Sequence, residues 1–317
     1  MVAAQLRGGG VVRPDQEPEI PTGWTVDPID WGEFWATEAT DPEYVIEPLF
    51  ARGRQTAIFS MAKTGKSLLV LDVVAAAVTG RSVLGQSPSP PVRVVYLDLE
   101  MTEADLRERL VDLGYGPDDD LSGLAYFQLP SLPPLDTDLG GLVLAELVQA
   151  HRADLVVIDT MARVVSGDEN SADTYRAFYR HTGMRLKAMG VALGRLDHMG
   201  KDGAAGQRGS SAKTDDLDTI YKLTATDLST LRLERTHTRV PWMAHEVNIV
   251  RREDPILRHV VVAEAWPAGT ADVAALLDEL DVALDATAAT AMTALKGSGN
   301  GRRRTLVLAA LKYRRNR

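Results

Sequence analysis

The chain has 317 residues, of which 45% are hydrophobic and 25% charged, the composition of a globular protein of one or two domains. Its longest apolar stretch, 68–78, is interrupted by Asp72 and is shorter than the roughly 18 residues that cross a membrane, so a membrane-spanning protein is excluded. The chain contains no cysteine, and its first residues lack the apolar segment of a signal peptide. A disulfide scaffold, a cysteine metal site and a cysteine nucleophile are therefore excluded, and a cytoplasmic location is expected.

The net charge of −9 argues at first sight against a nucleic-acid partner, but the charge is unevenly distributed. Residues 1–50 carry two arginines against ten acidic residues, whereas residues 286–317 carry eight basic residues and no acidic one. The part between them, 51–285, has a net charge of −9. We therefore expect the basic tail, together with cations in loops, to be what DNA would meet.

Strand and helix patterns alternate through the first two thirds of the chain. Residues 1–22 lack apolar periodicity and are expected to be a flexible arm, and a short helix that packs onto the main domain is expected near Trp31 and Trp35. The following strands are expected at 56–59, 92–97, 124–129, 154–158 and 191–196, and the helices at 67–78, 102–113, 140–151 and 172–189. This alternation predicts an α/β fold: a mostly parallel twisted sheet with helices on both faces.

The last third of the chain has a different pattern. Short strands are expected at 218–223, 230–235, 246–250 and 259–263, and helices at 271–280, 288–295 and 302–313. The strands indicate an antiparallel flank, and residues 282–295 resemble the turn and second helix of a helix-turn-helix. We thus expect an acidic arm with a short helix at 1–50, an α/β domain at 51–267 and a small basic helical domain at 268–317.

A phosphate-binding loop is expected between the first of these strands and the first long helix. The loop consists of Ser60, Met61, Ala62, Lys63, Thr64, Gly65, Lys66 and Ser67. Its end matches the Gly-Lys-Ser of a P-loop, in which backbone N–H groups at a helix N-terminus surround phosphates. Ser60 replaces the first glycine of that motif. Lys66 is expected to neutralise charge on the γ-phosphate of ATP, and Ser67 to ligate Mg²⁺.

Acidic residues end two of the expected strands at the sheet edge where open α/β folds bind ligands. Asp159 follows four apolar residues and is expected to hold Mg²⁺, through water. Glu100 follows another strand and is expected to orient and deprotonate the attacking water. Asp98, two residues earlier, is the competing candidate for that base.

Further candidates are a histidine and several cations. His198 ends the strand at 191–196 and is placed to sense the γ-phosphate. The loops at 160–172 and 199–214 carry candidate DNA contacts, as does the basic tail; these are Arg163, Lys201, Arg208, Lys213, Arg302, Arg303 and Arg304. Arg239 ends a strand of the antiparallel flank, far from the phosphate loop of its own subunit, and in a ring of subunits it could reach a neighbour's γ-phosphate.

Together these residues resemble the RecA-type P-loop ATPase core, and within it the RepA-like hexameric replicative helicases, which are related to the DnaB helicases. The phosphate loop, Glu100, Asp159 and His198 occur in that order and at similar spacings. The Asp-Glu-Asn-Ser run at 168–171 and the Arg-Gly-Ser-Ser run at 208–211 also resemble segments of that branch. The resemblance covers about residues 45–265, and the whole chain resembles a family of such ATPases from actinobacterial phages and mobile elements.

The resemblance implies roles for individual residues. Lys66 and Ser67 would bind phosphate and Mg²⁺, Glu100 would be the general base, and Asp159 the magnesium aspartate. His198 would couple the state of the γ-phosphate to the adjacent loop. Helicases of this class supply a lysine and an arginine, spaced Lys-x-Arg, to the neighbouring subunit. Here Arg239 is the candidate arginine finger, while His237 stands in place of the lysine.

Three functions follow as hypotheses. The first is an ATP-driven motor, a homo-oligomeric, hexameric ring that moves single-stranded DNA through its centre. The second is a DNA-binding initiator or loader, in which ATP controls oligomerisation and the C-terminal module contacts DNA. The third is a recombinase that forms filaments on DNA. All three require ATP and Mg²⁺, and none requires a membrane.

Overall fold

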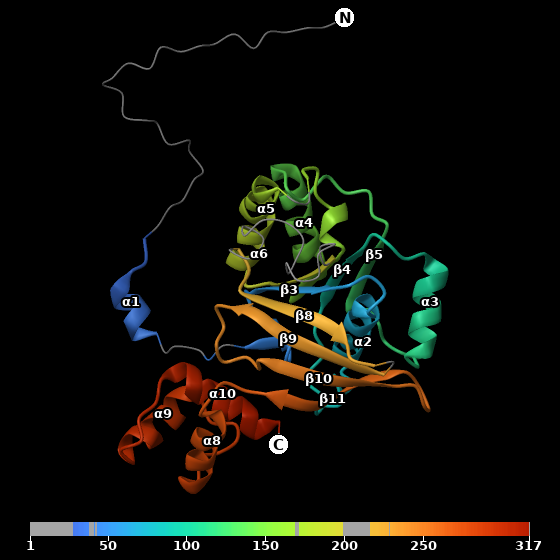
Figure 1. Ribbon diagram of the computed structural model, residues 1–317. Helices are drawn as coiled ribbons and strands as arrows, with labels where there is room; N and C mark the ends of the chain where they lie inside the picture. The colour runs from blue at the N-terminus through green and yellow to red at the C-terminus, as the bar shows by residue number, and fades with distance from the viewer. Residues whose placement is uncertain are drawn as a thin grey trace, which may run out of the picture. The chain divides into compact units, whose positions relative to one another are not determined.

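The computed structural model describes residues 28–37, 41, 43–168, 171–198, 216–227 and 229–316. At its centre is a nine-stranded sheet in the order β11-β10-β9-β8-β3-β7-β6-β4-β5 (Figure 1). The parallel strands are β8 (Thr219–Ala225), β3 (Gln55–Ser60), β7 (Ala192–His198), β6 (Leu155–Asp159), β4 (Val94–Asp98) and β5 (Leu124–Gln128). Antiparallel to their neighbours are β9 (Thr230–Thr238), β10 (Glu246–Arg252) and β11 (Arg258–Ala265). The predicted mostly parallel sheet with an antiparallel flank is confirmed. The expectation that the strand at 218–223 belongs to the antiparallel flank is wrong, because β8 pairs in parallel with β3.

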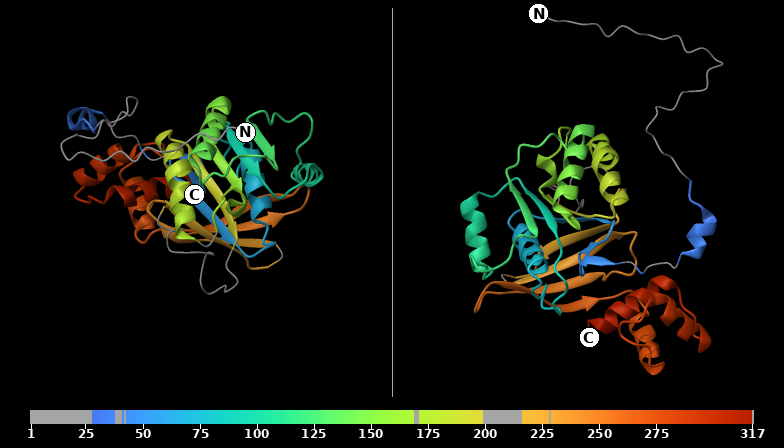
Figure 2. Two further views of the ribbon diagram at one scale, coloured as in Figure 1. Left: turned by 90° about the horizontal axis from the view of Figure 1, so that it is seen from above. Right: turned by 180° about the vertical axis from the view of Figure 1, so that it is seen from behind.

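Helices cover both faces of the sheet (Figures 1 and 2). On one face lie α2 (Lys66–Val78) and α3 (Glu103–Asp112); on the other lie α4 (Asp138–His151), α5 (Ala172–Phe178) and α6 (Met184–Ala188). The sequence of β4 is continuously apolar because both faces of the strand are buried. Val94 and Tyr96 join the core beneath α2, while Val95 and Leu97 join the core beneath α4 to α6. Helix α3 begins with the expected capping box between Thr102 and Asp105.

The helix expected at 172–189 is interrupted by a π-helical turn, Tyr179–Gly183, between α5 and α6. The carbonyl of His181 in this turn accepts a hydrogen bond from Nη1 of Arg185 at 2.7 Å. The same carbonyl lies against Gly141 of α4, where a Cβ atom would be only 1.9 Å from it. The packing of α4 against the turn therefore requires glycine at position 141, a tertiary contact that helical periodicity does not reveal.

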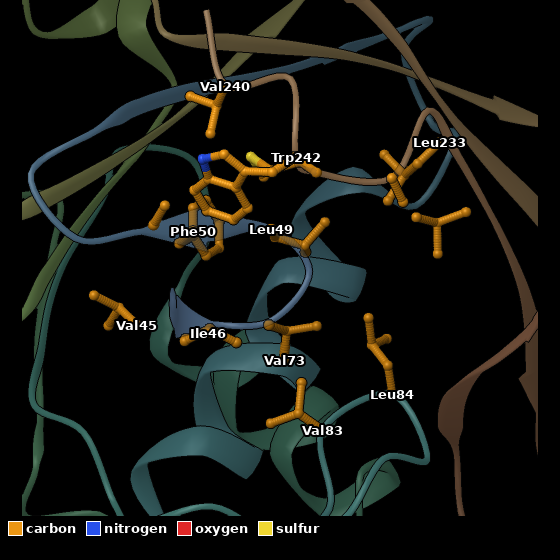
Figure 3. Close-up of a cluster of buried hydrophobic side chains, with 14 of the residues drawn as sticks. Val45, Ile46, Leu49, Phe50, Val73, Val83, Leu84, Leu233, Val240 and Trp242 are labelled. Carbon is orange, nitrogen blue, oxygen red and sulfur yellow. The ribbon is translucent and has the colours of Figure 1, made fainter. Parts of the chain in front are cut away.

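Residues 44–51 form two short strands, β1 (Tyr44–Ile46) and β2 (Phe50–Ala51), where the sequence indicated only an arm and a helix before residue 51. Apolar side chains of this segment, including Ile46, Leu49 and Phe50, pack with Val73 of α2 and Trp242 in the main core (Figure 3). The compact unit that contains the sheet accordingly extends from Asp41 to Arg317. The domain boundary expected at residue 50 remains a prediction of the sequence.

The C-terminal helices are α8 (Thr270–Glu279), α9 (Ala288–Gly297) and α10 (Arg304–Arg315). Residues 307–311 of α10 belong to the same buried cluster as α2 and the sheet. The expectation that the whole basic tail faces a partner is wrong for two of its cations, because Lys312 and Arg314 are buried. Arg314 forms an ion pair with Asp278 of α8 at 2.7 Å and so fastens α10 to that helix.

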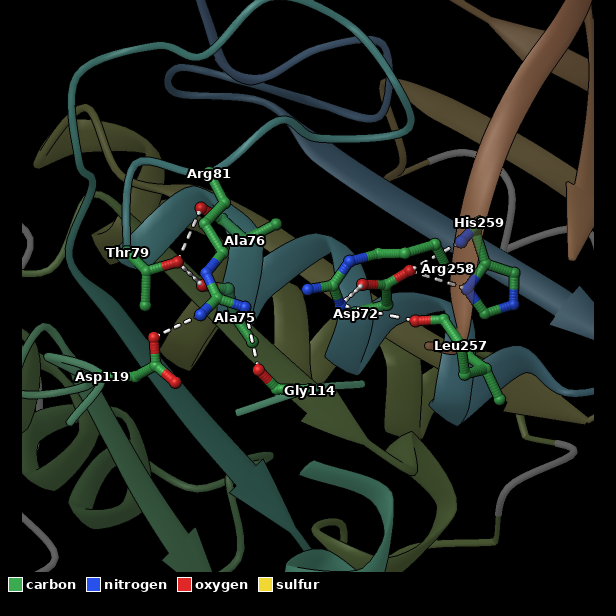
Figure 4. Close-up of polar contacts among 10 residues, drawn as sticks. All are labelled: Asp72, Ala75, Ala76, Thr79, Arg81, Gly114, Asp119, Leu257, Arg258 and His259. Carbon is green, nitrogen blue, oxygen red and sulfur yellow. Dashed lines mark hydrogen bonds and ion pairs between the residues drawn. The ribbon is translucent and has the colours of Figure 1, made fainter. Parts of the chain in front are cut away.

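A buried carboxylate explains the interruption of the apolar run in α2. Asp72 accepts hydrogen bonds of 2.9 Å from both the backbone N–H and Nδ1 of His259, and one of 3.3 Å from Nη1 of Arg258 (Figure 4). Both partners lie on β11, the outermost strand of the antiparallel flank. Asp72 therefore joins the helix that follows the phosphate loop to the far edge of the sheet.

A separate unit, Met1–Thr40, contains α1 (Trp31–Ala36). The side chain of Asp30 caps this helix by accepting hydrogen bonds from the N–H groups of Gly32 and Glu33. The ring of Phe34 contacts Trp31 and Trp35 edge to face, and all three aromatic side chains are exposed. None of the helices in the described ranges is long and apolar enough to cross a membrane.

Candidate functional site

The C-terminal ends of four parallel strands bring most of the predicted site residues to one edge of the sheet. Strand register places Ser60 of β3 beside His198 of β7, and Asp98 of β4 beside Asp159 of β6. The phosphate loop follows β3 directly, and Glu100 follows β4. The edge predicted from the apolar runs and their terminal polar residues is thus assembled from strands that are distant in sequence.

The phosphate loop turns from β3 into α2 with two residues in the left-handed region, Lys63 at φ 64° and Gly65 at φ 93°. Hydrogen bonds from the hydroxyls of Ser60 (2.9 Å) and Thr64 (2.8 Å) to the carbonyl of Met61 close the turn. Gly65 is the N-cap of α2 and provides no side-chain cap. The first N–H groups of this 13-residue helix can therefore bind an external anion, as a phosphate loop requires.

The loop tolerates the serine that replaces the first glycine of the motif. Ser60 is the last residue of β3, is buried, and pairs with both neighbouring strands. Met61, Ala62 and Lys63 are exposed, whereas Lys66 is buried at the start of α2. The strand, turn and helix therefore retain the P-loop arrangement.

Asp159 is buried at the centre of this edge and lies near Lys66 and Ser67. Burial, the largest effect, raises the pKa of its carboxyl, and Asp98 and Glu100 act in the same direction, while Lys66 and Ser67 oppose them. One carboxylate oxygen accepts a hydrogen bond from the Tyr96 hydroxyl at 3.2 Å. The other, Oδ1, is buried and has no hydrogen-bond partner among the described residues.

This arrangement fits a magnesium nucleotide. A buried carboxylate oxygen without a donor is costly unless a cation or a water molecule reaches it. Hard oxygen ligands such as a carboxylate and a hydroxyl suit Mg²⁺, which usually keeps several waters and is held partly by the phosphates of its nucleotide. Asp159 and Ser67 would therefore hold the ion, and Lys66 would bind the phosphates.

The structure distinguishes Asp98 from Glu100. Oδ1 of Asp98 accepts hydrogen bonds from the N–H groups of Glu100 (2.9 Å) and Met101 (3.1 Å), and Oδ2 accepts one from the hydroxyl of Tyr126. Asp98 is fully buried and holds the turn after β4. Glu100, at the surface of the same edge, is the carboxylate that an attacking water could reach.

Glu100 has two cationic or potentially cationic neighbours. Its Oε1 accepts a hydrogen bond from Nε of Arg163 at 3.4 Å and lies 3.6 Å from Nε2 of His198. Arg163 belongs to a 3₁₀ turn, Met161–Arg163, directly after β6. The structure thus brings the predicted base and the predicted phosphate sensor together, and adds Arg163, which the sequence indicated only as a DNA contact.

Arg239 lies at the opposite edge of the sheet from the phosphate loop, where the parallel strands β3 and β8 begin. Strand β9 runs antiparallel to β8, and the backbone N–H of Arg239 donates to the carbonyl of Asp218, just before β8 begins. The N–H of Asp218 in turn donates to the carbonyl of Gln55, the first residue of β3. Arg239 is therefore separated from the phosphate loop of its own chain by the length of β3, as the sequence predicted.

The other candidate DNA contacts fall into two groups. Lys201, Arg208 and Lys213 lie outside the described residues. The basic residues 302–304 line an open groove between α9 and the start of α10, together with Lys296 and Met292 of α9. Arg304 also forms an ion pair with Asp41, which leaves Arg302 and Arg303 as the more exposed cations of that triplet.

Sequence reasoning missed two tyrosines that shape the site. Tyr96 of β4 and Tyr126 of β5 are register partners, and their rings stack with centroids 4.9 Å apart. Burial raises the pKa of both hydroxyls, so each stays protonated and donates to an acidic strand end. The sequence signal that could have identified Tyr96 is its position two residues before Asp98, because side chains at that spacing share one face of a strand.

Comparison with known proteins bears on this geometry. The sequence profile of a family described as AAA domain matches residues 25–204, more than half of the chain. The chain belongs to the AAA domain family. Its AAA domain includes the phosphate loop, Glu100, Asp159 and His198, and the protein is therefore an ATPase of the P-loop, RecA-like class; such ATPases bind ATP together with Mg²⁺.

The fold of the AAA domain also occurs in a solved structure. A KaiC-like protein from the hyperthermophilic archaeon Pyrococcus horikoshii OT3 superimposes with a TM-score of 0.50 at 14% sequence identity. The alignment covers 69% of this chain and 94% of that chain. The similarity supports the RecA-like α/β fold. No curated protein sequence matches the chain.

Proposed function

We propose that this ATPase is an oligomeric motor that acts on DNA, in the manner of the RepA-like and DnaB-like helicases of phage and mobile-element replication. The observation that carries the proposal is the division of the candidate ATPase residues between two edges of one sheet. Lys66, Glu100 and Asp159 share one edge, and Arg239 lies at the other. An arginine at the second edge can act on a nucleotide bound at the first edge if subunits meet edge to edge.

The chemistry proposed is hydrolysis of the bond between the β- and γ-phosphates of ATP. Mg²⁺ bound with the nucleotide supplies positive charge at the phosphate oxygens. Glu100 accepts a proton from the attacking water, whose oxygen bonds to the γ-phosphorus, and ADP leaves with the bridging oxygen. Lys66 and the N–H groups at the start of α2 stabilise negative charge on the phosphates, and Arg239 of a neighbouring subunit does the same at the γ-phosphate.

DNA is the proposed partner because exposed cations occur near the catalytic edge and on the C-terminal helices. Arg163 extends from the turn after β6, and its side chain is 59% exposed. Lys296, Arg302 and Arg303 gather at the groove beside α9. In a ring these cations would recur in every subunit and concentrate positive charge despite the acidic overall composition.

The proposal is tested first by ATP hydrolysis and then by strand separation. The steady-state rate per subunit should rise with protein concentration, because the arginine comes from a neighbour, and Lys66→Ala should abolish it. A forked duplex with a single-stranded tail should then be unwound only when ATP can be hydrolysed. A rate per subunit that is independent of concentration, or the absence of unwinding despite hydrolysis, would contradict the motor.

A second candidate is favoured by the groove beside α9. Its combination of Lys296, Arg302 and Arg303 with a short helix fits an initiator or loader that contacts DNA through the C-terminal helices. Protection of one duplex site without unwinding would support this function. Negative-stain microscopy with a nonhydrolysable ATP analogue and a single-stranded oligonucleotide would separate a ring from a recombinase-like filament.

A further inference from the structure

A buried tyrosine just behind the catalytic edge contacts the candidate magnesium aspartate. Tyr96 of β4 is fully buried and pairs with Val157 of β6, two residues before Asp159. Because residues two apart on a strand share a face, Tyr96 and Asp159 lie on the same side of the sheet, the side that α2 covers. The hydroxyl of Tyr96 donates a hydrogen bond of 3.2 Å to Oδ2 of Asp159.

The two carboxylate oxygens of Asp159 therefore have different surroundings. Oδ2 accepts from Tyr96, whereas Oδ1 is buried and has no hydrogen-bond partner among the described residues. The torsion that rotates a carboxylate is broad, so a donor on one oxygen decides where the other oxygen points. The oxygen without a donor is the one left for a cation or for a water bound to that cation.

We propose that Tyr96 is a positioning residue for Mg²⁺, because its hydroxyl holds Oδ2 of Asp159 and so presents Oδ1 to the ion or to a water on the ion. This inference rests on the magnesium nucleotide of the proposed function, but not on DNA as the partner. Tyr96 acts through Asp159 and does not itself bind the metal. Hydrogen-bond partners of ligating carboxylates commonly determine metal affinity in this way.

The ring of Tyr96 is itself held in place. It stacks on Tyr126 of β5 with ring centroids 4.9 Å apart and an angle of 18° between the rings. The hydroxyl of Tyr126 donates to Oδ2 of Asp98, so each ring of the stack is tied to an acidic residue at the end of a strand. A donor fixed by packing and by a neighbouring hydrogen bond orients the carboxylate before the ion arrives.

Metal binding by wild type and by Tyr96→Phe, each with ADP bound, tests the inference. The substitution keeps the ring and its stacking and removes only the hydroxyl. Mn²⁺ prefers the same oxygen ligands as Mg²⁺, and electron paramagnetic resonance measures its free concentration in a titration. The dissociation constant for Mn²⁺ should rise by about 10–100-fold in Tyr96→Phe. Binding of a fluorescent ADP analogue in EDTA should be unchanged, because the phosphate loop is intact.

Tyr221→Phe is the matched control. Tyr221 of β8 is also fully buried, and its hydroxyl has no hydrogen-bond partner within the part of the chain that the structure describes. This variant loses the same atom from another part of the same sheet and should keep the Mn²⁺ affinity of wild type. Thermal unfolding without metal checks that both variants are folded. Equal losses of Mn²⁺ affinity in the two variants would overturn a specific role of Tyr96.

Asp159→Asn tests whether the hydroxyl of Tyr96 acts through the carboxylate. This variant should bind Mn²⁺ weakly by itself, because it lacks the charged ligand. Adding Tyr96→Phe to Asp159→Asn should cause no further loss of affinity, since the two residues belong to one interaction. If the two losses are additive, Tyr96 affects the ion by another route and the inference is overturned.

The outcomes separate this inference from the proposed function. If Tyr96→Phe binds Mn²⁺ as tightly as wild type or more tightly, the inference is overturned, while Asp159 stands as the metal ligand. If wild type with ADP binds no more Mn²⁺ than ADP alone does, the magnesium site and the inference fail together. If metal binding follows the expected pattern but no DNA is unwound, the motor is contradicted and the role of Tyr96 is supported.

Discussion

The backbone N–H of Arg239 donates a hydrogen bond to the carbonyl of Asp218, 2.7 Å away, at the sheet edge opposite the phosphate loop. The Asp218 side chain is buried there, and its carboxylate accepts from the N–H of Gln55 and from Nζ of Lys187. Arg239 is thus hydrogen-bonded through its backbone to a buried part of the sheet. This placement is compatible with the proposed contact of Arg239 with an adjacent subunit.

We expect Arg239→Ala to lower ATP hydrolysis by about 10³-fold or more while leaving nucleotide binding within about twofold of wild type. The reason is that an arginine supplied in trans stabilises charge in the transition state and contributes little to the ground-state complex. Single-turnover hydrolysis and binding of a fluorescent ATP analogue measure the two quantities. Arg252→Ala, which removes an exposed arginine at the end of β10, should leave both unchanged.

Mixing two inactive variants extends this test. Arg239→Ala subunits retain an intact phosphate loop, and Lys66→Ala subunits retain an intact Arg239, so mixed oligomers contain some complete sites. Hydrolysis should therefore reappear in the mixture and pass through a maximum as the ratio is varied. If the mixture stays inactive although the subunits co-assemble, Arg239 does not act between subunits.

Substitution of Asp98 should affect mainly the stability of the protein, whereas substitution of Glu100 should affect mainly ATP hydrolysis. Asp98→Ala removes the acceptor of three hydrogen bonds in a buried turn, and we expect a loss of about 2–4 kcal/mol of unfolding free energy. Glu100→Gln should change stability by less than about 0.5 kcal/mol, yet lower hydrolysis by about 10²–10⁴-fold. Urea unfolding and single-turnover kinetics together measure the contrast. Full hydrolysis by Glu100→Gln would exclude Glu100 as the base.

Most of the sheet could be predicted because the apolar residues that identify each strand are contiguous in the sequence. Four or five consecutive apolar residues, as in Val94–Leu97 and Leu155–Ile158, predict strands covered on both faces, and a following acid predicts the ligand-binding edge. The phosphate loop was equally local, because its residues are contiguous. The sequence therefore sufficed to propose Lys66, Ser67, Glu100 and Asp159 for one edge.

What could not be predicted depends on contacts between distant segments. The strands at 44–51 are too short to show a period, and they form because Ile46, Leu49 and Phe50 fill the core beside α2. The contact of Arg163 with Glu100 joins the ends of β6 and β4, and the sequences of these two strands do not indicate that they are neighbours in the sheet. The burial of Lys312 and Arg314 likewise follows from the docking of α10, which a count of basic residues cannot reveal.

Substitution of Asp72 should destabilise the protein without touching the phosphate loop. Asp72→Ala leaves His259 and Arg258 without their shared carboxylate, and breaking a buried ionic network of this kind costs about 3 kcal/mol or more. We expect a corresponding decrease in the free energy of unfolding in urea. Glu103→Ala, which breaks the exposed pair with Arg107, should cost less than about 0.5 kcal/mol. Equal effects of the two substitutions would contradict the assigned role of Asp72.

Lys312 should make stability depend on pH in the alkaline range. Burial lowers the pKa of its ammonium group from 10.5 to about 8, although the ammonium lies over the rings of Tyr44 (4.0 Å) and Trp242 (4.8 Å). Between pH 8 and 10.5 the unfolded chain therefore binds more protons at this residue than the folded protein does. Stability relative to Lys312→Met should rise with pH across that interval and level off above it.

The expected rise is about 1–3 kcal/mol, since the pKa difference corresponds to about 3 kcal/mol and the contacts with the two rings offset up to about 2 kcal/mol of it. Guanidinium unfolding of both proteins at several pH values measures it. Lys296→Met removes an exposed lysine of α9 and should give a difference from wild type that does not vary with pH. A flat difference for Lys312→Met as well would mean that the ammonium is not desolvated.

Gly194 of β7 tests the packing of the N-terminal strands against the sheet. A Cβ atom at this position would lie 2.5 Å from Cε1 of Phe50, a fully buried ring of β2, so one of the two must move. We expect Gly194→Ala to lower the free energy of unfolding by about 1–3 kcal/mol, and Phe50→Leu in the same chain to recover part of that loss by making room for the methyl group. Gly297→Ala, where a Cβ meets nothing within 4 Å, should cost nothing. If Gly194→Ala proves as harmless as Gly297→Ala, Phe50 does not pack on β7, and residues 44–51 are not part of the core.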